Sequence, residues 1–142
     1  MKLVCLDYGE KRTGIAVNAG SASLAFPHGI ILKTTRKAYF DELLKIIAAE
    51  QAEGVVIGLP LRDDGSDSLT TRRVRNLAAD LKLRIDLPVY FMEEAYTSAE
   101  AAAMLRHSGQ KIRRRDGRLD SLAAARILQT FLSLPPEQQT LA

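Results

Sequence analysis

The stretch that decides the fold lies at the start of the chain, where residues 2–18 read KLVCLDYGEKRTGIAVN. Two short apolar runs, Leu3–Leu6 and Ile15–Val17, flank a polar segment that contains Gly9 and Gly14. Short runs that are rich in Val and Ile and bounded by glycines are typical of buried strands. This stretch therefore predicts a β-hairpin at the centre of the fold.

Asp7 follows the first apolar run directly, so the sequence places a carboxylate at the edge of the core. A carboxylate is costly to bury unless it is paired, hydrogen-bonded or bound to a metal. An aspartate here also suits a turn, because its side chain can bond to the backbone of the following loop. From this segment alone, both interpretations of Asp7 stay open.

The composition is that of one ordinary globular domain. The chain has 142 residues, of which 46% are hydrophobic and 26% charged, and its formal net charge is +3. A chain of this length can form a stable hydrophobic core without disulfide bonds. The single cysteine, Cys5, lies within the first apolar run. We found neither an apolar run of membrane-span length nor a signal-peptide pattern, so we expect a cytoplasmic protein with a reduced core cysteine.

Basic residues are concentrated in two short runs. One contains Arg72, Arg73 and Arg75, and the other extends from Lys111 to Arg118. Such runs are usually solvated surface, but they also suit a polyanionic partner such as nucleic acid. The second run is too polar and too basic to pack, so we expect it to be a mobile loop.

The rest of the chain alternates strands and helices. The elements expected after the hairpin are, in order, a strand at Gly29–Lys33, a helix at Tyr39–Gln51, a strand at Val55–Gly58, a helix from about Leu69 to Arg84, a strand at Pro88–Met92, a helix from Thr97 to near Gly109 and a helix at Leu119–Leu132. Ser66 or Asp67 is expected to cap the second helix. These elements predict a single domain over residues 1–134, followed by a short, frayed polar tail over 135–142.

This order of elements predicts an α/β fold with a mixed, five-stranded sheet and helices on both faces. Three hairpin-connected strands followed by right-handed β-α-β crossovers give the strand order 3-2-1-4-5, with strand 2 antiparallel. Ligand sites in such sheets lie beyond the carboxyl ends of the parallel strands. Asp7 ends strand 1, residues 60–66 follow strand 4, and Glu93 and Glu94 follow strand 5, so we expect all of them at one edge.

Carboxylates at three places are candidates for a metal site at this edge: Asp7 after strand 1, Glu93 or Glu94 after strand 5, and Asp120, which opens the last helix. Acids brought together there would repel one another, and Mg²⁺ or Mn²⁺ is the expected counter-charge for oxygen ligands. A pair of metal ions held by carboxylates can activate a water and stabilise the leaving oxygen in phosphodiester hydrolysis. The basic loop before Asp120 could then hold the substrate backbone. Asp120 by itself has a simpler explanation, because an aspartate in a first helical turn interacts favourably with the helix dipole.

The motifs at these positions resemble those of a known family. They read DYGEKRTGIAV at residues 7–17, GLPLRDDGS at 58–66, EEAYTS at 93–98 and RLDSLAAARILQ at 118–129. Over nearly its whole length, the chain resembles the YqgF-type pre-16S rRNA nucleases, which are relatives of Holliday-junction resolvases with an RNase H-like fold. The first two motifs are specific in combination, whereas D-x-G alone also begins sugar kinases and actin-like ATPases, which are far longer.

The resemblance implies a cytoplasmic endonuclease that matures the 5′ end of small-subunit ribosomal RNA, with Asp7, Glu94 and Asp120 as its catalytic metal ligands. It also implies that Arg73 contacts phosphate. The other residues expected to bind nucleic acid are cationic: Lys11, Arg12, Lys111, Arg113, Arg114, Arg115 and Arg118. The glycines expected to shape the loops around the site are Gly9, Gly58 and Gly65.

The segment after strand 5 departs from the family pattern at two positions. After strand 5 the family usually has D-E-R, whereas this chain reads Glu93–Glu94–Ala95. The missing arginine removes a fixed bidentate contact to phosphate. Two alternatives therefore stay open: a nucleic-acid-binding module that keeps the fold without the chemistry, and a DNA-junction resolvase, because RNA and DNA offer the same phosphates.

Overall fold

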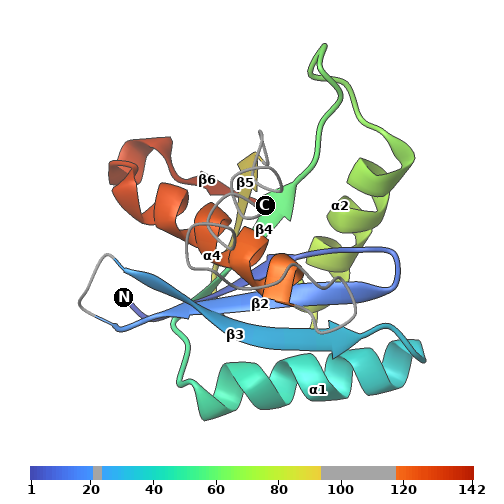
Figure 1. Ribbon diagram of the computed structural model, residues 1–142, viewed down its shortest axis with the longest axis vertical. Coiled ribbons are helices and arrows are strands. Elements are labelled where there is room, and N and C mark those ends of the chain that lie inside the picture. Colours follow the sequence, from blue (N-terminus) through green and yellow to red (C-terminus); the bar gives the residue numbers. More distant parts are fainter. Residues whose placement is uncertain (21–23, 94–117) are drawn as a thin grey trace.

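A computed structural model describes residues 1–20, 24–93 and 118–142, in which one β-sheet lies between two layers of helices (Figure 1). In chain order, the elements are β1 (Leu3–Asp7), β2 (Arg12–Asn18), β3 (Ala25–Leu32), α1 (Arg36–Ala49), β4 (Gly54–Leu59), α2 (Leu69–Lys82), β5 (Val89–Glu93), α4 (Arg118–Ser133), the short 3-10 helix η2 (Pro136–Gln138) and β6 (Thr140–Leu141). The helix expected from Thr97 and the basic run at 111–117 lie outside the described residues.

The strands lie in the order β3-β2-β1-β4-β5-β6. β2 runs antiparallel to β1 and β3, whereas β4 is parallel to both β1 and β5. This confirms the expected order of the first five strands and the antiparallel direction of β2. The expected number of strands is wrong by one, because β6 adds a sixth strand beside β5.

The C-terminal tail is ordered where we expected it to fray. Thr140 and Leu141 pair with Phe91 and Tyr90 of β5, and the Ala142 amide donates to the Val89 carbonyl at 2.8 Å. Without β6, this side of β5 would be an edge with unpaired backbone groups. Backbone hydrogen bonds to β5 hold the tail, and the polar side chains of the tail gave no sign of this pairing in the sequence.

β3 begins at Ala25, four residues earlier than the expected start at Gly29. Pro27 lies in this added part, where a residue without an amide hydrogen is tolerated because β3 is an edge strand. The pairing of β2 with β3 shifts register between Ile15 and Ala16, opposite Gly29 and Pro27. Gly29 has a φ of +121°, which favours glycine at this irregularity.

Side chains alternate along β1 and divide the core between the two faces of the sheet. Val4 and Leu6 pack with α1 and α2 on one face, whereas Leu3 and Cys5 pack with α4 on the other (Figure 1). β4 is buried at every position, as expected for a central strand covered on both sides. Within the described residues, no helix is long and apolar enough to cross a membrane.

Tyr39 of α1 is a buried tyrosine that joins this helix to β2. Its hydroxyl lies 2.7 Å from the Thr13 hydroxyl oxygen, and both side chains are buried. Burial raises the pKa of Tyr39 to about 12, although the hydrogen bond with Thr13 acts in the opposite direction. The native state therefore keeps this phenol neutral beyond the pH at which an ordinary tyrosine ionises.

We expect the protein to lose stability through Tyr39 as the pH rises from about 10 to about 12. Below pH 10 the stability contribution of the neutral Tyr39 phenol is fully present. Between about pH 10 and about pH 12 the phenol loses its proton in the unfolded chain but keeps it in the native state, so the free energy of unfolding falls by about 1.4 kcal/mol per pH unit. Urea denaturation of the wild type and of Tyr39→Phe at about pH 9 and about pH 11 measures this effect. The stability difference between the two proteins should shrink at the higher pH, and a constant difference would contradict the raised pKa.

Candidate functional site

A cleft of about 290 Å³ opens at the carboxyl end of β1, beside the first turn of α4. The charged residues that line it are Asp7, Glu10, Lys11, Arg12 and Asp120. Asp7 and Asp120 are far apart in the sequence, and the fold brings both to this cleft. The cleft therefore combines carboxylates with cations at the edge of the sheet where the strand order predicts a ligand site.

Gly14 allows α4 to approach β2 closely enough to bring Asp120 to the cleft. Gly14 pairs with Asp7 across the β1–β2 ladder. A Cβ placed on Gly14 would lie 2.1 Å from the Asp120 carbonyl oxygen and 3.0 Å from the Ser121 nitrogen. The first turn of α4 thus rests on the bare backbone of β2, next to Asp7. The sequence marks Gly14 as part of a hairpin motif, but its role depends on which helix covers it.

Arg12 provides a positive charge beside Asp120. The Nε of Arg12 lies 3.7 Å from Oδ2 of Asp120, and both side chains are partly exposed. An exposed pair of this kind adds little to stability, because solvent screens it. Asp120 also lies in the first turn of α4, where the helix dipole favours a carboxylate. The position of Asp120 is therefore compatible with both roles considered from the sequence. It lies in the first turn of a helix, and it also lines the cleft.

The other residues predicted to bind nucleic acid are found in different places. Lys11 is exposed and lines the cleft of Asp7, whereas Arg73 of α2 lines a second pocket. Arg118 is the first residue of α4. The remaining predicted site residues lie outside the described residues: Glu94, Lys111, Arg113, Arg114 and Arg115.

Glu10 is an exposed carboxylate of the cleft that the sequence did not single out. It lies in the turn between β1 and β2 and lines the cleft together with Asp7 and Asp120. The described part of the chain contains no group of three or more acidic, histidine or cysteine side chains close enough to hold a metal ion. Asp7 and Asp120 are therefore the two predicted ligands that the structure brings together.

The three glycines expected in loops have different roles. A Cβ on Gly9 would lie 2.4 Å from the Arg12 carbonyl oxygen, so glycine is required for the tight turn beside the cleft. Gly65 has a φ of +84° in the loop after β4. The expectation is wrong for Gly58, because this residue is buried within β4, where it pairs with Met92.

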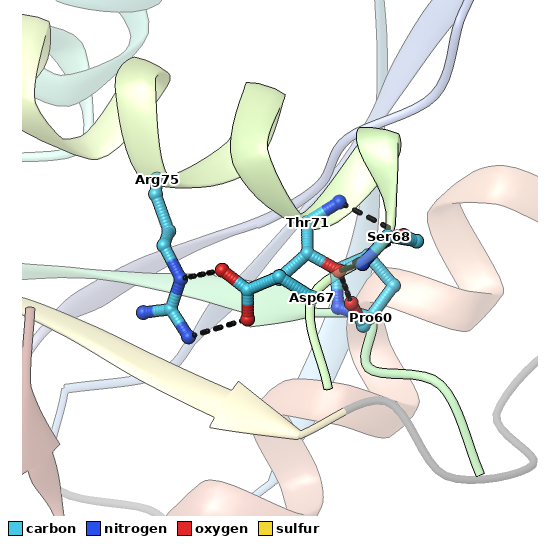
Figure 2. Close-up of polar contacts among 5 residues, drawn as sticks. All are labelled: Pro60, Asp67, Ser68, Thr71 and Arg75. Carbon is cyan, nitrogen blue, oxygen red and sulfur yellow. Dashed lines mark hydrogen bonds and ion pairs between the residues drawn. The ribbon is translucent and has the colours of Figure 1, made fainter. Parts of the chain in front are cut away.

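Hydrogen bonds between side chains and backbone fix the end of the loop that follows β4 (Figure 2). The Thr71 amide donates to the Ser68 hydroxyl at 3.1 Å, and the Ser68 amide donates to the Thr71 hydroxyl oxygen at 2.9 Å. The Thr71 hydroxyl also donates to the Pro60 carbonyl. This capping box ties the start of α2 to the end of β4.

Asp67 has a role different from the one expected. Ser68 is the N-cap of α2, so the expectation that Ser66 or Asp67 caps this helix is wrong. Asp67 instead accepts hydrogen bonds from Nε and a terminal nitrogen of Arg75 at 2.8 and 3.1 Å (Figure 2). These bonds lower the pKa of the Asp67 carboxyl. Arg75, an arginine of the first basic run, therefore holds Asp67 at the end of this loop.

Comparison with known proteins identifies close relatives of the same length. A family described as "RuvX: Holliday junction resolvase" matches residues 1–134. A protein of Nitratidesulfovibrio vulgaris (strain DSM 19637 / Miyazaki F) named "Putative pre-16S rRNA nuclease" is 49% identical over 140 residues, which cover 99% of each chain. A protein of Oleidesulfovibrio alaskensis with the same name is 46% identical over 139 residues, which cover 98% of this chain and 96% of the relative.

Solved structures with the same fold come from Thermus thermophilus. RuvC in complex with a Holliday junction substrate superposes with a TM-score of 0.62 at 18% identity, and the match covers both chains in full. A second RuvC structure gives a TM-score of 0.59 at 17% identity. These similarities concern the fold, and they confirm the expected RNase H-like architecture. The match over residues 1–134 and the close full-length relatives show that this chain belongs to the RuvX family of Holliday junction resolvase-like nucleases.

Proposed function

We propose that this protein is an endonuclease that uses Mg²⁺ or Mn²⁺ to hydrolyse a phosphodiester bond in the 5′ region of pre-16S ribosomal RNA. The observation that carries the proposal is the convergence of Asp7 and Asp120 on one cleft that Lys11 and Arg12 also line. The names of the two close relatives support this choice of substrate.

The carboxylates of the cleft fit a hard divalent cation. Asp7 and Asp120 offer carboxylate oxygens, the ligand type that Mg²⁺ and Mn²⁺ prefer. Glu94, implied as a third ligand by the family resemblance, directly follows Glu93, the last residue of β5. A divalent ion bound there would polarise the scissile phosphoryl group as a Lewis acid.

The two carboxylates belong to elements that are well anchored in the core. The four residues of β1 before Asp7 are buried, and α4 is held by Ile127, Leu128 and Phe131, each at most 1% exposed. Catalytic groups on such rigid elements keep their positions better than groups on loops. Lys11 and Arg12 add positive charge beside them, which suits the phosphate backbone of the substrate.

Cleavage of a 5′-extended precursor of small-subunit ribosomal RNA tests the proposal, with a four-way DNA junction assayed alongside. We expect cleavage of the RNA after addition of Mg²⁺ or Mn²⁺ and none in the presence of a chelator. Preferential cleavage of the junction would identify a DNA resolvase instead. Salt-dependent binding of both substrates by folded protein, without cleavage of either, would identify a binding module.

A further inference from the structure

A second pocket, also of about 290 Å³, lies on the face of the sheet that α1 and α2 cover. Its charged lining consists of Lys33, Arg36, Arg73 and Asp80. Tyr39 and Phe40, which also line it, are almost fully buried, so the pocket has an apolar inner wall beneath an exposed cationic rim. Of the predicted nucleic-acid contacts within the described residues, Arg73 is the one that lines this pocket.

Of the three cations that line this second pocket, one is paired with an acid among the described residues. Arg36 forms an ion pair with Asp80, the one carboxylate in the lining. Lys33 Nζ instead donates to the Tyr8 hydroxyl at 2.5 Å and lies 4.9 Å from the centre of that ring. Across residues 1–20, 24–93 and 118–142, neither Lys33 nor Arg73 pairs with a carboxylate. An anion in the pocket would therefore be attracted by two cations that lack a counter-charge on these residues.

The second pocket and the cleft of Asp7 lie on opposite faces of the sheet, and residues at the turn between β1 and β2 line both. Asp7 and Tyr8 are consecutive residues, with Cα atoms about 3.8 Å apart, and Asp7 lines the cleft whereas Tyr8 lines the second pocket. The Lys33 amide donates to the carbonyl of Lys11, a residue of the cleft, at 3.0 Å. A strand bound at the cleft would therefore have to pass over this turn to reach the second pocket.

We propose that the second pocket binds a phosphodiester group of the substrate strand, on the other side of the β1–β2 turn from the bond held at Asp7 and Asp120. Lys33 and Arg73 contact the phosphate, and the Thr34 hydroxyl and Asn76 amide at the rim offer neutral hydrogen bonds. The identity of the strand as substrate rests on the proposed nuclease function. The pocket favours a strand over a free anion because its cations are exposed and residues at the β1–β2 turn line both the pocket and the cleft.

Binding of a labelled single-stranded RNA to a cleavage-deficient Asp7→Asn protein, measured by fluorescence anisotropy over a series of salt concentrations, tests this proposal. Each phosphate contact to a single strand contributes about 0.7 to the slope of log affinity against log salt. Adding Lys33→Ala and Arg73→Ala should lower that slope by about 1.4 and weaken binding at low salt roughly tenfold or more. Both side chains are exposed, so these changes remove no core contact.

Arg72→Ala is the matched control, because Arg72 is the exposed neighbour of Arg73 on α2 and does not line the pocket. This variant should leave the slope and affinity unchanged. An unchanged slope in the double variant, or an equal loss in Arg72→Ala, would overturn the proposal. Tighter binding of adenosine monophosphate than of RNA would also overturn it, in favour of a free nucleotide. Failure of the nuclease function would instead appear as absent cleavage by the wild type, independently of these slopes.

Discussion

Replacing Asp7 by asparagine should abolish metal-dependent cleavage while the protein stays folded. Asparagine has nearly the same volume, but it removes the negative charge from the end of β1, where Asp7 is only partly buried. A catalytic metal ion supplies several kcal/mol of charge stabilisation in the transition state. Losing most of it corresponds to a rate loss of roughly a thousandfold or more.

The loss should be specific to this carboxylate, which a matched variant can establish. Glu42 is an exposed acid of α1 that lines neither pocket, so Glu42→Gln makes the same chemical change away from the cleft. We expect single-turnover cleavage of the precursor RNA to be unchanged in Glu42→Gln and lost in Asp7→Asn, with similar thermal unfolding in both. Full cleavage by Asp7→Asn would exclude Asp7 as a catalytic ligand.

Replacing Gly14 by alanine should damage the site without changing any charged group. The added methyl carbon would lie 2.1 Å from the Asp120 carbonyl oxygen, so the start of α4 must move away from β2. Overpacking of this kind costs about 1–3 kcal/mol of stability. A displacement of a catalytic group by about 1 Å can lower the rate roughly a hundredfold. We therefore expect a folded, less stable protein with strongly reduced cleavage.

Gly20→Ala separates the effect on α4 from a general loss of stability. Gly20 has a φ of +67°, and no atom of the described residues lies within 4 Å of its would-be Cβ, so alanine there strains the backbone without a steric contact to them. The expected cost is about 1–2 kcal/mol, and cleavage should be unchanged. Wild-type cleavage by Gly14→Ala would mean that α4 adapts to the methyl group and that Gly14 does not position Asp120.

The order of the central strands and the place of Asp7 could be predicted from the sequence. Leu3–Leu6 and Ile15–Val17 form buried strands as their apolar character indicates, and residues 55–58 lie in a strand buried throughout. The handedness of β-α-β crossovers then leaves few possible strand orders. Asp7 is the last residue of β1, because the strand ends just after the apolar run Leu3–Leu6. Glu94 stays a prediction of the sequence, since it lies outside the described residues.

The contacts that complete the site were decided by the tertiary structure. The approach of α4 to Gly14, the ion pair of Arg12 with Asp120 and the pairing of β6 with β5 all join segments that are distant in sequence. The same holds for the pocket that gathers Lys33 and Arg73. Local periodicity and turn chemistry determine which residues form strands and helices. They do not determine which helix covers which backbone, because that depends on how whole elements pack against each other.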